Sequence, residues 1–307
     1  MKRSWKRRAI VSILAAAVLL AAAVFYPKER AYRAAVRLQE QGKSAEAYRK
    51  YVQLGGWRDS AGRASALREK DPRIAMLAAQ KWDTVFLGHC EQDADPSNGA
   101  EPLEWIVLDR EEEEDGGAAL LLLCRDCISC TAYHKPVEDI TWERSTLRAW
   151  LNGSFLQETF EEEEQALIAE TRLENPGNDL LGIDGGPVTE DAVFLLSAPE
   201  FSVYFSQEDA RWLFARAQAS LQARAEGIYL SGDSGREDPD VEEDGEYARW
   251  WLRSPGNEAY SAQFVEEDGR IFEGGAAVDI DYMYGLRPAV WVHLAEPRTD
   301  YSRRDHF

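Results

Sequence analysis

The sequence has few of the residues on which nucleophilic and metal chemistry depend, with four cysteines and four histidines among 307 residues. The histidines lie in no recognisable catalytic motif, and no His or Cys doublet completes a usual zinc spacing. The chain also lacks a phosphate-binding loop and a dinucleotide-binding fingerprint. These absences argue against nucleophilic catalysis and against nucleotide chemistry.

Basic residues are also scarce, because 35 lysines and arginines stand against 55 aspartates and glutamates, which gives a net charge of −20. A surface this acidic repels nucleic acids and anionic membranes, so we expect no nucleic-acid partner. It permits cations and neutral ligands such as sugars or peptides. Solubility alone also accounts for such a charge.

The N-terminus combines basic residues with a long uncharged run. After the basic stretch over residues 2–8, the segment AIVSILAAAVLLAAAVFY (residues 9–26) carries no charge. It is long enough to cross a bilayer, and the bases before it favour a cytoplasmic start. We therefore expect a single-pass signal-anchor transmembrane helix over residues 1–26, with the rest outside the cell membrane. A cleaved signal peptide and a buried soluble helix are the alternatives.

Residues 27–80 have the spacing of helices, with large and small apolar residues three and four positions apart. Gly42 and Gly55 are natural helix ends. The pattern resembles one tetratricopeptide unit and part of a second, and such arrays need about three repeats for stability. We therefore interpret the segment as a helical stalk, with peptide binding as the alternative.

Residues 81–296 predict an α+β domain, and residues 297–307 a polar tail. Short apolar runs at both ends of this domain predict strands that meet in one sheet, with a hairpin turn at Asp268–Gly269. Between them, residues 145–171 predict helix, divided in two at Gly153, and residues 207–227 predict a further helix.

Four sequence blocks occur in a fixed order in this domain. They are TWERSTLRAWLNGSF (141–155), DAVFLLS (191–197), WWLRSPG (250–256) and GLRPAVWV (285–292). The order resembles an uncharacterised bacterial domain family common in clostridial-type Gram-positive bacteria. Its members often follow a transmembrane helix and tetratricopeptide-like segments, and no activity is implied.

The last two blocks also resemble the C-type-lectin-like domains of the sulfatase-modifying type. That resemblance implies a loop-rich mixed domain with adjacent termini. The enzymes of that group rely on a cysteine pair near the end of the domain, and this chain has no cysteine after Cys130. Their catalysis therefore cannot be carried over.

The aromatic and arginine residues of these blocks are the candidate ligand-binding set. Successive side chains of a strand face opposite ways, so one of two adjacent tryptophans is expected in the core and the other beside an arginine at the surface. An exposed tryptophan of this kind would stack on a sugar ring or a planar group. The alternative is a core of tryptophans with arginines paired to buried carboxylates. The candidates are Trp250, Trp251, Arg253, Arg287, Trp142 and Arg148.

Three cysteines at three-residue spacing, Cys124, Cys127 and Cys130, raise the possibility of metal ligation. They continue an apolar strand, however, in which Cys127 would face away from the other two. We therefore favour buried thiols, or one disulfide to Cys90, and expect no metal.

An acidic stretch over residues 93–104 matches a calcium loop in part. Asp93, Asp95, Ser97 and Glu104 fall at ligand positions one, three, five and twelve, but Gly99 is one place late. A simple acidic turn is the favoured interpretation, here and over residues 232–246, with calcium as the alternative.

The sequence thus supports three hypotheses. The first is a membrane-anchored extracytoplasmic binding module that recognises a glycan, a peptide or a cell-wall component. The second is an extracellular enzyme, metal-assisted if calcium or another metal is bound. The third is a scaffold that docks partner proteins through its helical segment.

Overall fold

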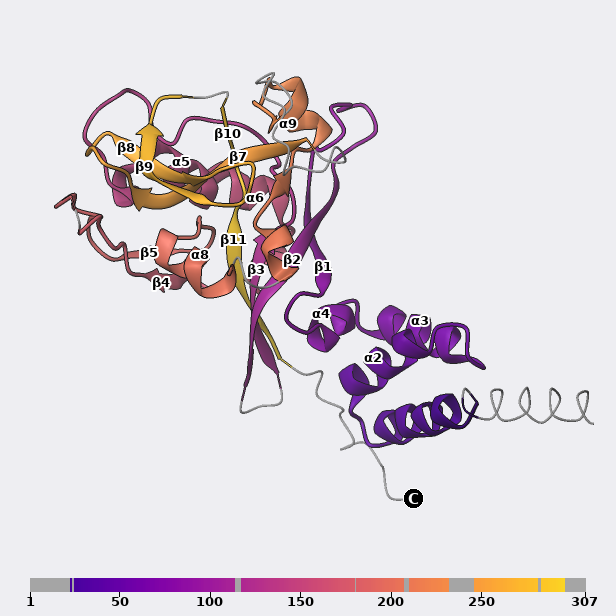
Figure 1. The fold of residues 1–307 in the computed structure, drawn as a ribbon. Helices are drawn as coiled ribbons and strands as arrows, with labels where there is room; N and C mark the ends of the chain where they lie inside the picture. Colours follow the sequence, from indigo (N-terminus) through magenta and orange to yellow (C-terminus); the bar gives the residue numbers. More distant parts are fainter. Residues whose placement is uncertain are drawn as a thin grey trace, which may run out of the picture. The chain divides into compact units, whose positions relative to one another are not determined.

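The structure is a computed structural model that describes residues 23, 25–113, 117–179, 181–206, 210–231, 246–280 and 283–295. The chain divides into two compact units. We call the described residues up to Ala79 the helical unit and Gln80–Ala295 the mixed domain (Figure 1).

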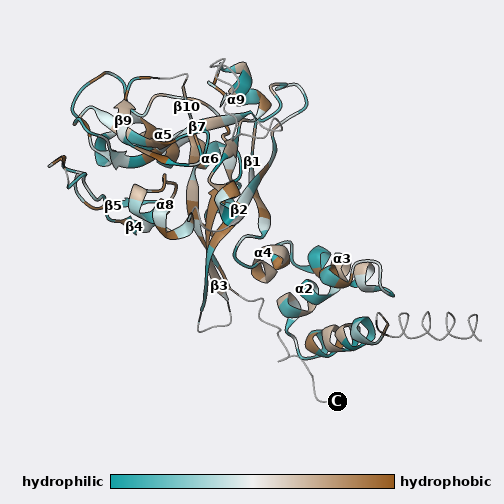
Figure 2. Cartoon of the chain, in the orientation of Figure 1, coloured by the Kyte–Doolittle hydropathy of each residue, from teal (hydrophilic) through white to brown (hydrophobic). Residues whose placement is uncertain are grey.

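The helical unit contains a helix over residues 25–40 and three further helices, α2 (Ser44–Leu54), α3 (Ser60–Lys70) and α4 (Ile74–Ala78). Gly42 and Gly55 have positive φ angles of 80° and 56°, which glycine adopts without strain, and both predicted helix ends are confirmed. The helix over residues 25–40 shows both brown and teal residues in Figure 2, as an amphipathic helix should. Its buried face contributes Tyr32 and Ala35 to a core with Tyr51 and Leu67.

The predicted transmembrane helix over residues 1–26 requires correction. In the part of the chain that the structure describes, no helix is both long enough and apolar enough to cross a bilayer. Residues 1–22 lie outside that part. From residue 25 onward the helix carries charged residues, which ends the apolar run. The single-pass anchor, and the cell-membrane location with an outside domain that depended on it, are therefore set aside.

Strands from the two ends of the mixed domain share one antiparallel sheet, as the sequence predicted. Its order is β1 (Thr84–Cys90), β2 (Glu101–Glu112), β3 (Ala118–Cys124) and β11 (Ala289–Leu294). Every residue of β3 is buried, because the strand is covered on both faces and paired on both edges. Figure 1 shows β3 in magenta beside β11 in yellow.

A second sheet carries the tryptophan-rich strand. Its order is β10 (Tyr284–Gly285), β7 (Tyr247–Pro255), β8 (Ser261–Val265) and β9 (Ile271–Ala277), and β6 (Ala217–Gln218) also pairs with β7. The predicted hairpin is confirmed, since Val265 pairs with Ile271 and Gly269 between them has a φ of 91°. A short separate pair joins β4 (Thr171–Leu173) to β5 (Thr189–Asp191).

Short helices connect these strands. They are η1 (Trp142–Arg144), α5 (Thr146–Trp150), the π-helix η2 (Leu151–Phe155), α6 (Leu156–Thr159), α7 (Glu162–Gln165), α8 (Ala198–Tyr204), η3 (Ala210–Phe214) and α9 (Leu221–Ala225). The predicted break at Gly153 is confirmed, because its φ and ψ of −112° and −107° are not helical. The mixture of helices and strands agrees with the predicted α+β content.

The single helix expected over residues 207–227 is wrong. Residues 207–209 lie outside the described chain, η3 ends at Phe214, and Ala217 and Gln218 pair with β7 instead. The helix α9 begins only after Ser220, whose hydroxyl accepts a hydrogen bond from the Ala223 amide at 3.1 Å. Pairing with a neighbouring strand therefore outweighs the helical propensity of this segment.

Candidate functional site

Both tryptophans of the Trp250–Trp251 pair are buried, so the expectation of one exposed indole is wrong. The Trp250 indole donates a hydrogen bond to the Ala215 carbonyl at 3.0 Å, and its ring contacts Phe201. The Trp251 indole donates to the Thr131 carbonyl at 2.9 Å. The two adjacent side chains still point to opposite faces of β7. Both faces are covered, however, so each indole is buried against a different part of the domain.

Arg253 connects four segments of the mixed domain from a side chain that is 1% exposed. Its guanidinium forms an ion pair with Glu200 and donates to the Leu195 carbonyl at 2.6 Å. It also donates to the Glu174 carbonyl at 3.1 Å and to the Asn175 side-chain oxygen at 3.2 Å. These contacts describe a buried structural arginine rather than one that awaits a ligand.

Arg287 is fully buried and has no carboxylate partner among the described residues. Its Nε donates to the Cys124 carbonyl at 2.8 Å, and its guanidinium lies 4.9 Å from the centre of the Trp250 ring. Burial lowers the pKa of Arg287, since a charge in this environment loses its hydration. The side chain therefore joins the segment before β11 to the end of β3 inside the core and faces no open cleft.

The remaining two candidates, Trp142 and Arg148, meet at one buried carboxylate. Asp191 accepts a hydrogen bond from the Trp142 indole at 2.8 Å and from the Arg148 Nε at 2.6 Å. Thr189 donates to the same carboxylate at 3.0 Å. This network fastens η1 and α5 to β5, and it matches the alternative in which arginines pair with core carboxylates.

The cysteines form no disulfide, and all four lie within the described chain. The strand β3 ends at Cys124, so the strand expected through Cys130 is interrupted. Burial raises the pKa of Cys90 and of Cys127 to about 12, which leaves both as neutral thiols near pH 7. The three clustered cysteines do not converge on a metal site, since the ligand atoms that gather closely enough among the described residues are carboxylate oxygens.

The partial calcium loop does not bring its four predicted positions together. Asp95 accepts hydrogen bonds from the amide and hydroxyl of Ser97, while Glu104 pairs with Arg125 at 2.9 Å. Local turns and a surface ion pair thus engage these side chains. A different acidic group has ligand atoms within 4.8 Å of one another, namely Glu91, Asp93 and Glu101. Calcium binding stays a prediction of the sequence.

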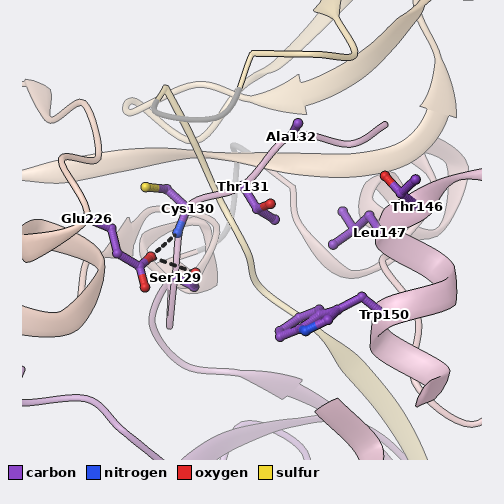
Figure 3. A pocket seen from close by; sticks show the side chains of 8 residues that line it. All are labelled: Ser129, Cys130, Thr131, Ala132, Thr146, Leu147, Trp150 and Glu226. Atoms are coloured by element: carbon purple, nitrogen blue, oxygen red, sulfur yellow. Dashed lines mark hydrogen bonds between the residues drawn. The ribbon is translucent and has the colours of Figure 1, made fainter. Parts of the chain in front are cut away.

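A pocket of about 390 Å³ opens elsewhere on the mixed domain, within the size range of small-molecule sites, about 300–1,000 Å³. We call it the Trp150 pocket. It is lined by residues 129–132, by Thr146, Leu147 and Trp150 of α5, and by Glu226 just after α9. Figure 3 shows Glu226 and Trp150 on opposite sides of residues 129–132. The Trp150 side chain is 39% exposed, so a ligand can reach its ring.

The wall formed by residues 129–132 is held by the second sheet and the segment that follows it. The Leu286 amide donates to the Ser129 carbonyl at 2.9 Å, and the Trp251 indole holds the Thr131 carbonyl. The predicted ligand residue Trp251 therefore acts behind the pocket and positions its wall. Arg148 likewise fixes α5, which carries Trp150, and none of the six candidates from the sequence is among the residues that line the pocket.

Gly285 allows the chain to pass close behind this wall. A Cβ atom at this position would lie 2.5 Å from the Cys127 Sγ and 3.0 Å from the Ile228 Cδ1. We therefore expect Gly285→Ala to lower the free energy of unfolding by about 1–3 kcal/mol, the usual cost of overpacking. Urea unfolding of the full chain measures this loss.

The matched control is Gly62→Ala in α3, where nothing lies within 4 Å of the new Cβ outside the helix backbone. This change should leave stability unchanged or slightly higher, because alanine favours helix. Equal losses in the two variants would contradict the close contact at Gly285.

The other walls of the pocket come from α5 and from the residue after α9, and a serine caps the N-terminus of each helix. The hydroxyl of Ser145 caps α5, and the His134 Nδ1 accepts a hydrogen bond from the Thr146 amide at 3.2 Å. Trp150 then lies at the last position of α5, with its ring 5.0 Å from that of Phe155. The hydroxyl of Ser220 caps α9, which Glu226 follows. A short, capped helix thus presents a large aromatic ring beside the pocket.

Sequence reasoning missed Trp150 and Glu226 as site residues. The available signal for Trp150 was its place three residues before Gly153, where a helix that breaks leaves its last side chains uncovered. Glu226 has no comparable signal, because it comes to the pocket from a segment 96 residues away from Cys130, whose amide it binds.

The fold and the pocket together define a mixed α and β domain with a small-molecule-sized cavity. The chain belongs to the family described as Domain of unknown function (DUF6273), which matches residues 118–294. This confirms the prediction of an uncharacterised domain family. No curated protein and no solved structure matches the chain. The C-type-lectin-like resemblance therefore gains no support from known folds.

Proposed function

We propose that the mixed domain is a binding module and that the Trp150 pocket takes a carbohydrate ring. One observation carries this proposal, namely that an exposed indole forms one side of a cavity whose other sides bear hydroxyl groups and a carboxylate. Tryptophan stacks well on the apolar face of a sugar ring. The hydroxyls of Thr131 and Thr146 and the Glu226 carboxylate can exchange hydrogen bonds with sugar hydroxyls.

A glycan suits this pocket better than an extended peptide or a larger wall polymer bound through its backbone. Peptides that lie along a protein commonly add a strand to a free sheet edge. The pocket is lined by a loop segment and by residues at helix ends, and its lining residues belong to no named strand. A compact sugar ring can stack on Trp150, and its hydroxyl groups can form hydrogen bonds with the threonines and the glutamate of the pocket.

Each of the four sequence blocks contributes to the Trp150 pocket or to its supports. Residues 141–155 supply Trp150, and residues 191–197 supply the carboxylate that fastens α5. Residues 250–256 and 285–292 hold the wall at residues 129–132. We propose that these blocks recur in the family because they build the pocket, and that the protein is of clostridial-type origin.

Replacing Trp150 with alanine should weaken sugar binding by about tenfold or more. A central aromatic residue contributes about 2 kcal/mol to many binding sites, and about 1.4 kcal/mol corresponds to a factor of ten. The full chain is screened on an array of soluble oligosaccharides, and the affinity of the best ligand is measured by calorimetry for both proteins.

The control is Phe86→Ala, which removes an aromatic side chain that is 61% exposed on β1 and outside the pocket. This variant should bind as the unchanged protein does. If no oligosaccharide binds the folded chain, or if both variants weaken binding equally, the proposed function is wrong. The enzyme and scaffold alternatives remain predictions from the sequence.

A further inference from the structure

We infer that the ligand of the Trp150 pocket carries a positively charged amino group, which pairs with Glu226, beside a sugar ring that stacks on Trp150. The ligand class is therefore an amino sugar with free amines, within a short oligosaccharide. This inference rests on the proposed function, because it names the ligand of the same pocket.

The Glu226 carboxylate is fixed in place by neighbours that donate hydrogen bonds. The Ser129 hydroxyl and the Cys130 amide donate to its Oε2 at 2.6 and 2.9 Å, as Figure 3 shows. The Gln222 side chain donates to its Oε1 at 2.8 Å. A carboxylate oxygen accepts about two hydrogen bonds, so Oε2 is satisfied and Oε1 retains capacity for a donor from a ligand.

Glu226 is the charged side chain among the pocket-lining residues, and the arginines of the two helices beside the pocket, α9 and α5, pair with other carboxylates. Arg224 of α9 pairs with Glu246, and Arg148 of α5 pairs with Asp191. The negative charge of Glu226 is therefore not neutralised by either side chain. A charged donor forms a stronger hydrogen bond with a carboxylate than a neutral hydroxyl does.

The charge of the whole chain acts in the same direction. A net charge of −20 attracts cationic ligands to the protein and repels anionic ones, so sialylated or phosphorylated sugars are disfavoured. Pairing with an amine also compensates the desolvation of the carboxylate when a ligand covers the pocket. A neutral sugar would leave that compensation to hydroxyl groups alone.

The arrangement of the pocket requires both features in one ligand. Figure 3 shows residues 129–132 between Glu226 and Trp150, so a bare ammonium ion at Glu226 would leave the indole uncovered. The hydroxyls of Thr131 and Thr146 also need polar partners when a ligand displaces water from them. A hexosamine unit has an apolar ring face, hydroxyl groups and an amine, and it answers each of these requirements.

The test compares two oligosaccharides that differ at the amine. Calorimetry with the full chain uses a glucosamine tetramer and its N-acetylated counterpart, in a buffer acidic enough to keep the amines charged. We expect the free amine form to bind at least about tenfold more tightly. Its affinity should also fall as salt is added, whereas that of the acetylated form should not.

The variant Glu226→Gln separates the charge from the shape of the pocket. Glutamine retains an oxygen for the Ser129 hydroxyl, so the variant should fold, which circular dichroism checks. We expect the preference for the free amine to fall to about twofold or less, with little change for the acetylated tetramer. The matched control, Glu273→Gln on the exposed surface of β9, removes the same charge away from the pocket and should keep the preference.

The outcomes distinguish this inference from the proposed function. Equal binding of the two tetramers to the unchanged chain would overturn the amine inference and leave the sugar site standing. Binding of neither tetramer, or tighter binding of a lysine peptide of equal charge, would overturn the sugar assignment. Loss of the preference in Glu273→Gln would show a general charge effect and would also overturn the role of Glu226.

Discussion

Arg253→Met is expected to lower the free energy of unfolding by about 2–4 kcal/mol, less than for a fully buried ion pair because the Glu200 side chain is 36% exposed. Glu200 would lose its counter-ion, and the carbonyls of Leu195 and Glu174 would lose a donor. Each buried acceptor left without a partner adds about 1–3 kcal/mol. Urea unfolding of the full chain, followed by circular dichroism, measures the loss.

The control for Arg253 is another arginine paired to a carboxylate at the surface. Arg270 pairs with Asp268 at 3.4 Å and its side chain is 66% exposed, so Arg270→Met should cost less than about 1 kcal/mol. A double change, Arg253→Met with Glu200→Met, should cost less than the sum of the two single changes because both single changes remove the same interaction. Similar losses for Arg253→Met and Arg270→Met would show that the buried contacts contribute little.

Trp251→Ala is expected to destabilise the chain by a comparable amount, about 3–5 kcal/mol, as for other large aromatic residues in a core. The ring packs between Tyr133 at 5.9 Å and Tyr284 at 4.1 Å, and it is fully buried. Its removal would leave a cavity between β10 on one side and the segment around Tyr133 on the other, and neither can easily move to fill it. The same unfolding measurement applies.

A milder change at this position tests how the core supports the pocket. Trp251→Phe keeps most of the ring but removes the indole donor to the Thr131 carbonyl, and it should cost about 1–2 kcal/mol. Since Thr131 lines the Trp150 pocket, ligand affinity should also fall. Trp150→Ala, at an exposed position, provides the comparison, and a loss of stability as large as that of Trp251→Ala would contradict the supporting role of the buried indole.

Much of the secondary structure followed from local features of the sequence. Gly153 divides a helical segment, the turn at Asp268–Gly269 closes a hairpin, and Gly42 and Gly55 end helices. In each case the backbone conformation depends on residues only a few positions apart. Such features can be predicted from one sequence.

The errors arose where distant segments decide the outcome. The rule of alternating faces placed one of Trp250 and Trp251 at the surface, but β7 is covered on both sides by segments far away in the chain. The helix expected over residues 207–227 yielded to pairing with Tyr247 and Ala248. Periodicity describes the two faces of an element and does not tell what covers each of them.

The site depended most on distant contacts. Trp150 and Glu226 meet at one pocket only after the loop at residues 129–132 is placed between them, and Glu226 binds the Ser129 hydroxyl across 97 residues. The candidates that the sequence did indicate, such as Arg253 and Arg148, are arginines of the supporting core. A single sequence thus indicated buried residues of the surrounding core more readily than the residues that line the pocket.

The pairing of β3 with β11 has a consequence during protein synthesis. The ribosome produces β3, an almost wholly aliphatic strand, long before Ala289–Leu294 of β11 emerges to cover one of its edges. Until then the nascent chain exposes a hydrophobic strand with an unpaired edge, and such strands associate with one another and aggregate. A soluble product therefore requires that β11 is translated, or that a chaperone binds β3 until it is. C-terminal truncations before Ala289 should accumulate in the insoluble fraction.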